Sequence, residues 1–369
     1  MLGWVQHGWL TRFYQHANIE NIIMKSQLPV HPEEATKKLF SVLPKRTKDV
    51  LEKRFGLGKS TERMTLDAIG KGYGITRERV RQIEADGLLR VRKSDAIKDL
   101  GGVFAELENY FNEGGKVFKE SHILSAIAQH PKHENHVYFL LSLHSPFVRF
   151  HENEYLHDRW AHGHNSHSLV EKTLSQTVSE LRKIGKPIKE DALLGILGNC
   201  AKAVAGGTVD KNFLQNWLGV SKLISQNYFG EWGLCEFPEI KPRGVKDLSY
   251  MVLSRHGSPL HFSNVAQEIG KLVGKNAHVQ TVHNELIKDQ RFVLVGRGLY
   301  ALKEWGYAPG MVKDVIYDTL KSSGPLNKEK IMALVGQKRL VKSNTIAINL
   351  ENKKYFKKLS DGRYNITNS

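Results

Sequence analysis

Residues 65–90 read TLDAIGKGYGITRERVRQIEADGLLR, and this stretch decides the fold of its part of the chain because it has the pattern of a helix-turn-helix. Leu66 and Ile69 are three residues apart, as on one side of a short first helix. Gly74 can supply the tight turn between the helices, where a positive φ is often needed. Thr76 is a suitable N-cap for the second helix.

The second helix is expected to have two different sides. At about 100° per residue, Val80, Ile83 and Gly87 fall on one side, which we expect to face the core. The opposite side spans an arc of about 140° by the same reckoning. It carries four polar residues, which we call the reading face: Arg77, Glu78, Arg81 and Gln82.

The reading face has the chemistry needed to read base edges. Arg can bind guanine through two hydrogen bonds, Gln can bind adenine in the same way, and Glu can accept from cytosine. The alternative is an ordinary solvated helix face with charge pairs four residues apart. The excess of Arg over acidic residues and the preceding turn favour a helix that docks on DNA.

Two segments, LPKRTKDVLEKRFGLG (43–58) and TLDAIGKGYGITRERVRQIEADGLLRVR (65–92), resemble region 4 of primary-type bacterial sigma factors. The resemblance covers about residues 37–93. It implies binding to the double-stranded minus-35 promoter element, with Arg77, Glu78 and Gln82 facing bases and Arg81 at the border of the phosphates. It also implies a contact with the flap of the RNA polymerase beta subunit. We expect phosphate contacts from six further residues: Arg54, Thr65, Arg79, Arg90, Arg92 and Lys93.

This segment departs from the family pattern at a few positions. Tyr73 stands where the family usually has Leu, and Gly72 adds a helix-breaking residue just before the turn. Asp86 and Gly87 replace the usual Lys and Ala. These departures leave the reading face unchanged. In the family, apolar residues of the preceding helices pack around the flap tip, and the candidates here are Val50, Leu51 and Phe55. The alternative is that these three residues belong to the core.

The charge of the chain is concentrated in two segments. The net charge is +16, and the isoelectric point is about 9.6. Residues 37–93 hold sixteen Lys and Arg against seven Asp and Glu, and residues 308–369 hold twelve against five. The remainder is neutral. A basic segment near each end suggests two contacts with a polyanion. A charge excess that only keeps the protein soluble is the alternative, and it fits the C-terminal segment better.

The rest of the chain repeats a pattern at intervals close to seventy residues, with a glycine-led entry to a helix each time, at Gly115, Gly185, Gly257 and Gly324. Each unit then ends in an aromatic, strand-like stretch with hairpin turn signals. Three helices and a β-hairpin are typical of a winged helix. We therefore expect a mainly α fold, with the helix-turn-helix (37–93) followed by tandem α+β winged-helix modules. These modules are expected at 100–163, 168–240, 246–307 and 309–367, and the second is the least clear because its hairpin near 225–237 is hard to see.

The third module has a resemblance of its own. SPLHFSNVAQEIGKLVGKNAHVQTVHNELIKDQRFVLVGRGLYALKEWGY (258–307) resembles the HARE-HTH domain, a winged-helix family, and the likeness extends back to Leu248. Members occur in the delta subunit of bacterial RNA polymerase, in restriction systems and in eukaryotic chromatin regulators. Arg297, flanked by glycines at the tip of the expected hairpin, is a candidate for a phosphate contact.

The expected last helix of this module has an apolar stripe that we assign to the core: Val282, Leu286 and Ile287. Four polar residues on or beside its exposed side contact either phosphates or nothing: His278, His283, Asn284 and Lys288. The sequence does not decide between these two roles.

Other signals argue against catalysis. The His-rich stretch 157–167 (HDRWAHGHNSH) has no zinc-site spacing, so we interpret it as a polar interdomain linker. The two cysteines, Cys200 and Cys235, cannot form a Cys-based zinc site. The sequence has neither a Gly-rich phosphate loop nor a nucleophile elbow. We therefore expect no enzyme activity, catalytic residue, cofactor or metal. No apolar run approaches eighteen residues, so we expect no membrane span and a cytoplasmic, nucleoid-associated bacterial protein.

These observations favour a sequence-specific DNA-binding transcription factor that acts with RNA polymerase. Residues 1–36 are expected to be an N-terminal extension that is disordered, is a partner-binding helix, or results from a start upstream of Met24. They are too few for the bundle with which sigma factors melt promoters. One alternative is the recognition or sensing subunit of a restriction or defence nuclease. Another is a nucleoid protein that binds DNA without sequence preference.

Overall fold

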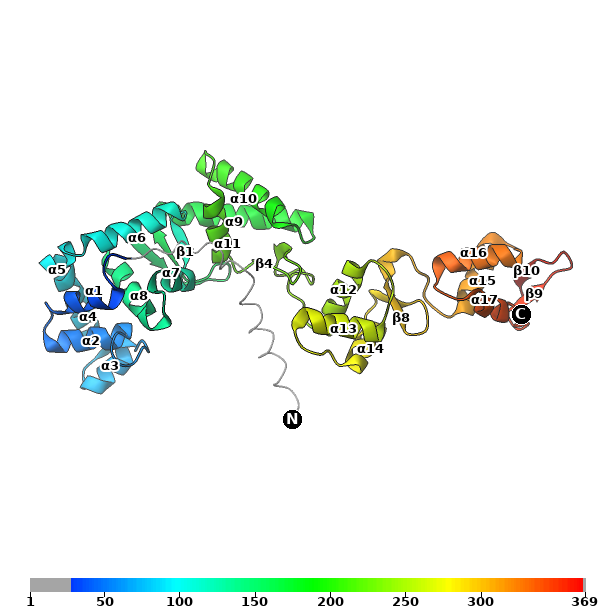
Figure 1. Ribbon diagram of the computed structural model, residues 1–369, viewed down its shortest axis with the longest axis horizontal. Coiled ribbons are helices and arrows are strands. Elements are labelled where there is room, and N and C mark those ends of the chain that lie inside the picture. Colours follow the sequence, from blue (N-terminus) through cyan, green and yellow to red (C-terminus); the bar gives the residue numbers. More distant parts are fainter. Residues whose placement is uncertain (1–27, 368–369) are drawn as a thin grey trace. The chain divides into compact units, whose positions relative to one another are not determined.

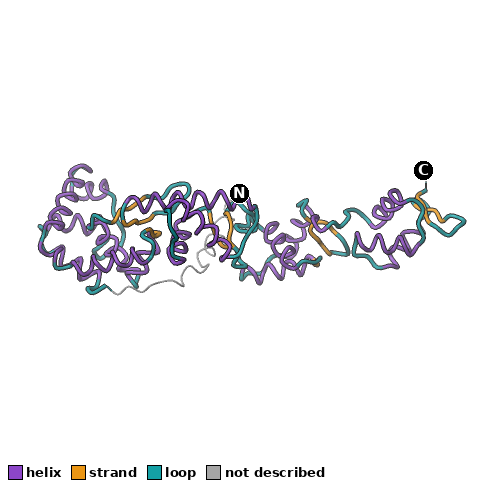
Figure 2. The backbone as a smooth tube through the Cα atoms, turned by 90° about the horizontal axis from the view of Figure 1, so that it is seen from above, coloured by secondary structure: helices purple, strands orange, loops and turns teal. Residues whose placement is uncertain are grey.

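The computed structural model describes residues 28–367, so most of the expected N-terminal extension lies outside the described residues. The chain divides into two compact units, one that ends at Glu236 and one that begins at Phe237. Figure 1 labels most of the elements, and Figure 2 shows the strands as short segments among many helices. The fold is mainly α with small antiparallel sheets, as the sequence predicts. None of the helices in the described part is long and apolar enough to cross a membrane.

The first unit begins with the predicted helix-turn-helix. Two helices precede it, α1 (Pro32–Phe40) and α2 (Lys45–Phe55). The helix-turn-helix itself consists of α3 (Leu66–Tyr73) and α4 (Arg77–Lys93), and α5 (Asp95–Lys98) follows directly. Because α1 begins at Pro32, residues 32–36 are part of this fold.

The next segment has helices and strands in the order expected of a winged helix. Its elements are α6 (Gly101–Glu113), β1 (Val117–Lys119), α7 (Glu120–Ala128), η3 (Pro131–His133), α8 (Glu134–Leu143), β2 (Phe147–Phe150) and β3 (Arg159–His162). The strands form an antiparallel sheet in the order β1-β3-β2.

The last segment of the first unit repeats this order. It contains α9 (His164–Ile184), α10 (Glu190–Ala205), α11 (Lys211–Val220), β4 (Ile224–Gln226) and β5 (Trp232–Leu234). A bridge between Ile188 and Trp232 takes the place of the first strand. The hairpin that was hard to see in the sequence is present. Its turn is closed by the Asn227 side chain, whose Oδ1 accepts from the amides of Phe229 and Glu231 at 2.9 and 3.0 Å.

The second unit contains two more segments of this kind. The first has α12 (Val245–His256), β6 (Leu260–His261), α13 (Phe262–Val273), α14 (Val279–Lys288), β7 (Phe292–Leu294), β8 (Leu299–Leu302) and η4 (Lys303–Trp305). The second has α15 (Val312–Ser323), α16 (Lys328–Lys338), α17 (Ser343–Leu350), β9 (Phe356–Lys358) and β10 (Tyr364–Ile366). We call each hairpin that follows the third helix of such a segment its wing.

The helix-turn-helix segment and the segment that follows it share one hydrophobic core. Phe40 of α1 and Phe55 of α2 each pack edge-on against Phe139 of α8, with ring centroids 5.1 Å apart in both cases. The cluster contains residues of both segments, from Ala35 of α1 and Leu51 of α2, through Val91 of α4, to Trp160 of β3. The helix-turn-helix segment therefore packs against the segment that follows it and is not a separate domain joined to it by a linker.

The His-rich stretch is not a linker, which corrects the interpretation from the sequence. Residues 159–162 form β3, the central strand of the first sheet, and α9 begins at His164. Arg159 and His167 are buried, and Arg159 Nε donates to His167 Nε2 at 2.9 Å. The His167 ring also stacks on Phe150, with centroids 3.7 Å apart. Arg159 and His167 therefore have a structural role, because each satisfies the other's polar groups inside the protein.

Candidate nucleic-acid interface

The turn between α3 and α4 has the local geometry that its sequence predicts. Thr65 caps α3, since its Oγ1 accepts from the amide of Ala68 at 3.2 Å. Gly74 ends α3 in the left-handed region, with φ at 63°. Thr76 caps α4 by accepting from the amide of Arg79 at 3.1 Å. Both helix starts are therefore fixed by side-chain acceptors.

Two other glycines allow close approaches around this motif. A Cβ at Gly70 would lie 2.7 Å from the carbonyl oxygen of Ile75, which is backbone of the turn. A Cβ at Gly87 would lie 2.6 Å from Cγ2 of Thr47, so the glycine lets α4 approach α2 closely. Gly72, in contrast, has no atom of the described residues within 4 Å of its Cβ position. The departure from the family at Gly87 thus has a packing reason, and the one at Gly72 has none.

A small core orients α4. Val50, Ile69 and Val80 form a buried cluster, and Ile83 packs against it. Gly87 is also buried. These residues lie on the side of α4 that helix periodicity assigns to the core.

The reading face lies on the opposite side of α4, and all four of its side chains are exposed. Arg81 and Glu78 form an ion pair, with Nη2 and Oε1 2.7 Å apart, and this pairing lowers the pKa of Glu78. Gln82 accepts from Arg79 Nη1 at 3.0 Å. Within the described part of the chain, no hydrogen bond or ion pair holds the guanidinium of Arg77. Exposed pairs of this kind contribute little to stability, so they can be exchanged for contacts with a ligand.

The predicted phosphate contacts fall into two groups. Arg79, Arg90 and Lys93 are exposed on α4, and Thr65 is exposed at the start of α3, where its capping hydroxyl still has a proton to donate. Arg54 has partners within the protein, because it donates to Glu84 and to the Met64 carbonyl, each at 3.2 Å.

Arg92 also has partners within the protein. It donates to the carbonyls of Ser142 and Leu143, at 2.8 and 3.1 Å, and so ties α4 to the end of α8. Sequence reasoning missed this structural use, because the two partners lie about fifty residues away.

The apolar residues considered for a flap contact are in the core. Val50 and Leu51 are fully buried and Phe55 is 6% exposed, which supports the alternative stated for them. The large apolar side chains that this part of the structure does expose are Val42 and Leu89, at 42% and 48%.

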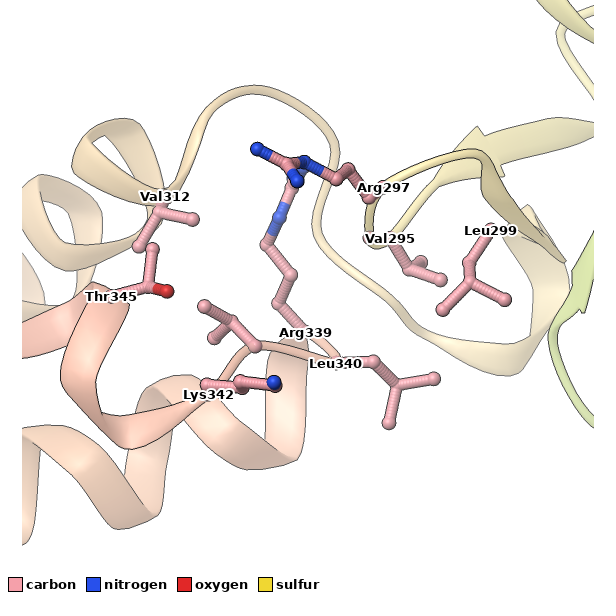
Figure 3. Close-up of a pocket in the computed structure, with 10 residues that line it drawn as sticks. Val295, Arg297, Leu299, Val312, Arg339, Leu340, Lys342 and Thr345 are labelled. Carbon is pink, nitrogen blue, oxygen red and sulfur yellow. The ribbon is translucent and has the colours of Figure 1, made fainter.

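A second basic surface lies in the second unit. Arg297 is exposed at the tip of the wing between β7 and β8, as predicted for a hairpin tip. It lines a pocket together with Arg339, Lys342 and Thr345, which Figure 3 shows. Arg339 is 7% exposed and donates to the carbonyl of Gly310. Burial lowers the pKa of its guanidinium. The sequence offered no signal that singled out Arg339.

The side chains of α14 only partly follow their predicted roles. Val282 and Leu286 are buried, but Ile287 is 62% exposed, so its assignment to the core is wrong. Val282 and Leu286 are four residues apart and lie on the same side of α14. Ile287 is the next residue, so it is turned about 100° away from that side. His283 is half-buried and stacks on Phe262, with centroids 4.2 Å apart. The other polar candidates are exposed: His278, Asn284 and Lys288.

This geometry defines a helix-turn-helix, and comparisons with known proteins show what it is similar to. Residues 39–93 match the family described as Sigma-70, region 4. The RNA polymerase sigma factor SigA of Bacillus sp is 41% identical over 70 residues, which are 18% of this chain and 18% of that relative. The chain thus spans less than a fifth of the relative's length. The helix-turn-helix of residues 39–93 is thus similar to sigma-70 region 4.

Proposed function

We propose that this protein binds duplex DNA in a sequence-specific way, with α4 in the major groove and the reading face against base edges. The observation that carries the proposal is the exposed reading face on a capped second helix, within a segment that matches sigma-70 region 4. Arg77 is the foremost base contact, because its guanidinium is exposed and no partner has to be displaced. Arg81, Glu78 and Gln82 exchange their mutual contacts for base contacts.

Phosphate binding holds α4 in register on the duplex. Arg79, Arg90, Lys93 and Thr65 are the contacts that we propose for this purpose, because their polar groups are exposed. Arg54 and Arg92 act as positioning residues, since their guanidinium groups bind carbonyls and a carboxylate of the protein itself. Phosphate contacts carry no sequence information, so they affect all DNA sequences alike.

The four helical segments that follow α4, with the boundaries expected from the sequence, are proposed to be winged-helix modules, and the third to be of the HARE-HTH kind. The support is the same order of helix, short strand or bridge, two helices and a wing in each. The fourth, with its twelve basic residues against five acidic ones, provides a second contact with DNA. Arg297, at the wing tip next to it, is exposed and well placed for the same phosphates.

We propose further that the protein acts with RNA polymerase as an accessory or competing factor and has no enzymatic role. The support is that the relative is an RNA polymerase sigma factor. Contact with the beta flap would have to use exposed apolar residues such as Val42 and Leu89, because the three first candidates are buried. Retention of the protein by isolated beta flap tests the association. Promoter opening by core polymerase with this protein alone would contradict the accessory role.

The experiment that tests the DNA-binding proposal is a selection of bound sequences from random duplex DNA, with and without RNA polymerase. A defined sequence motif is expected, and its recovery should depend on Arg77. Recovery of random sequences, together with steep loss of binding in salt, would instead indicate a nucleoid protein that only binds phosphates. Binding to a sequence motif that RNA polymerase does not affect would favour the alternative that the protein is the recognition subunit of a restriction or defence nuclease.

A further inference from the structure

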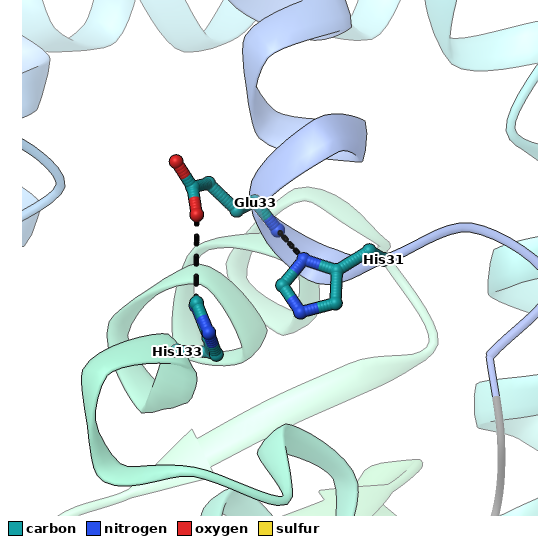
Figure 4. A group of neighbouring side chains, drawn as sticks. All are labelled: His31, Glu33 and His133. Atoms are coloured by element: carbon teal, nitrogen blue, oxygen red, sulfur yellow. Dashed lines mark hydrogen bonds and ion pairs between the residues drawn. The ribbon is translucent and has the colours of Figure 1, made fainter.

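Two histidines and a glutamate from distant parts of the chain meet at the start of α1. His31 is the N-cap of α1, Glu33 lies in its first turn, and His133 ends η3. Their candidate ligand atoms all lie within 4.8 Å of one another. Figure 4 shows the three side chains converging between α1 and the segment that leads into α8.

The hydrogen bonds in this cluster are incomplete. Among residues 28–367, the buried Nδ1 of His133 has no hydrogen-bond partner. The nearest carboxylate oxygen, Oε2 of Glu33, is 3.9 Å away, which is too far for a hydrogen bond. Buried polar atoms of native proteins nearly always have a partner, and a bound ion can be that partner. The observation therefore points to a ligand between these groups.

The donor atoms of this cluster suit a cation. Imidazole nitrogens and carboxylate oxygens are both ligands of zinc-type ions. Lys37 is paired with Oε1, so Oε2 is the oxygen that faces His133.

We propose that His31, Glu33 and His133 bind one divalent transition-metal ion of the zinc type, with a water molecule at the fourth position. Two imidazoles and one carboxylate are a known zinc ligand set, with bonds of about 2.0–2.2 Å. The present separations are wider than such a set requires, so small side-chain rotations bring the three groups onto the ion. The adjoining pocket is lined by His31, His130 and His133, and it leaves room for the water.

Metal binding at this site exchanges one interaction for another. His31 Nδ1 accepts from the amide of Glu33 at 3.3 Å, which is a long hydrogen bond. A neutral imidazole cannot accept a hydrogen bond at one nitrogen and bind a metal at the other, because one of the two nitrogens carries the proton. The ion therefore replaces the cap as the group that fixes His31.

The consequence is structural, because the ion joins α1 to the segment before α8. α1 and the two helices that flank this segment, α7 and α8, contribute to the core that the helix-turn-helix shares with its neighbour. Metal binding should therefore stabilise the first unit and hold the base of the DNA-reading segment in place. The site is independent of the reading face, so it does not depend on the proposed function.

The test uses the full chain without an affinity tag, titrated with Zn²⁺ and, for its visible absorption bands, with Co²⁺. We expect binding of one equivalent, a saturable rise in Tm, and Co²⁺ bands of a four-coordinate site. Three variants remove one ligand each: His31→Asn, Glu33→Gln and His133→Asn. The Asn at position 31 keeps a good N-cap, so its effect reports the loss of the imidazole and not the loss of the cap. Each variant should weaken the affinity for the metal by more than about 100-fold. This is a larger loss than the removal of a residue that only hydrogen-bonds to a metal ligand would cause.

His130→Asn is the matched control. The His130 ring is a neighbour of His133, with centroids 5.8 Å apart, and its Nδ1 accepts from the Lys132 amide, a role that Asn can keep. Its affinity for the metal should be unchanged. No saturable rise in Tm, or a rise that persists in Glu33→Gln and His133→Asn, would overturn the proposal. An equal loss of affinity in His130→Asn would overturn the three-ligand assignment.

Discussion

Arg63 Nε donates to Oδ1 of Asn135 at 2.8 Å, across 72 residues of sequence. The same Asn135 side chain donates through Nδ2 to the carbonyls of Gly56 and Thr61, at 3.0 and 2.7 Å. The Arg63 guanidinium also lies 3.7 Å from the ring centre of Tyr138. One side chain of α8 thus organises the loop that leads from α2 into the helix-turn-helix.

Asn135→Ala should therefore destabilise the first unit by about 1–3 kcal/mol, because it removes the partner of Arg63 and two backbone acceptors lose their donor. The measurement is urea-induced unfolding at pH 7. Asn349→Ala is the control, since in the described part of the chain the exposed Asn349 side-chain amide bonds only to the Thr345 carbonyl of its own helix. Equal effects of the two substitutions would contradict the organising role of Asn135.

Gly70 and Gly72 should respond in opposite directions to alanine. In Gly70→Ala the new Cβ meets the Ile75 carbonyl, a backbone atom that cannot move without opening the turn. We expect a loss of stability and weaker DNA binding. In Gly72→Ala the Cβ meets nothing within 4 Å, so the protein should gain up to about 1 kcal/mol from the higher helix propensity of Ala. Thermal unfolding of both variants checks this, and a stabilised Gly70→Ala would show that the close approach at the turn is wrong.

Stability should fall in mild acid. Burial lowers the pKa of His136 and of His157 to about 4, whereas an unfolded histidine titrates near 6.5. Between these two pKa values the unfolded chain binds more protons, so stability is complete above about pH 6.5 and is lost as the pH falls towards 4. Allowing for partial solvent exposure, we expect each histidine to lower the free energy of unfolding by about 1 kcal/mol when the pH falls from 7 to 5.

Urea unfolding of the parent protein and of His136→Gln at both pH values measures this effect. The variant should lose less stability on going from pH 7 to pH 5 than the parent does. A parent protein that is equally stable at both pH values would contradict the prediction.

Deletion of residues 308–369 should weaken DNA binding and reduce its salt dependence. The segment has a hydrophobic core of its own, so its removal should leave the rest folded. Fewer phosphate contacts release fewer counterions, which makes the plot of log affinity against log salt less steep. The preferred DNA sequence should not change. A slope equal to that of the full chain would remove this segment from the DNA-binding account.

Local signals in the sequence were sufficient for the helix-turn-helix. The caps at Thr65 and Thr76, the turn at Gly74 and the buried side of α4 all depend on residues within one or two helical turns. The same holds for the wings that carry glycine turns. The Asn227 turn gives a weaker signal, because a side chain closes it in place of a glycine pair.

Interactions between distant residues could not be predicted from the sequence. Arg92 is a predicted phosphate contact, yet it binds carbonyls at the end of α8. The His-rich stretch looked like a linker because its composition is polar, and only the sheet shows Arg159 and His167 paired inside. His31 and His133 lie about a hundred residues apart, so no spacing in the sequence brings them together.

The central claim, that α4 reads bases, is tested most directly by comparing Arg77→Ala with Arg90→Ala on the selected DNA site and on scrambled duplex DNA. Both substitutions remove one exposed arginine from α4. Arg77→Ala should weaken the binding free energy for the selected site by about 1–3 kcal/mol. On scrambled DNA it should weaken binding only by the small amount that the loss of one positive charge causes. Arg90→Ala should lose the same amount on both. Equal losses on both DNAs for Arg77→Ala would show that the reading face only holds phosphates, and the claim would be wrong.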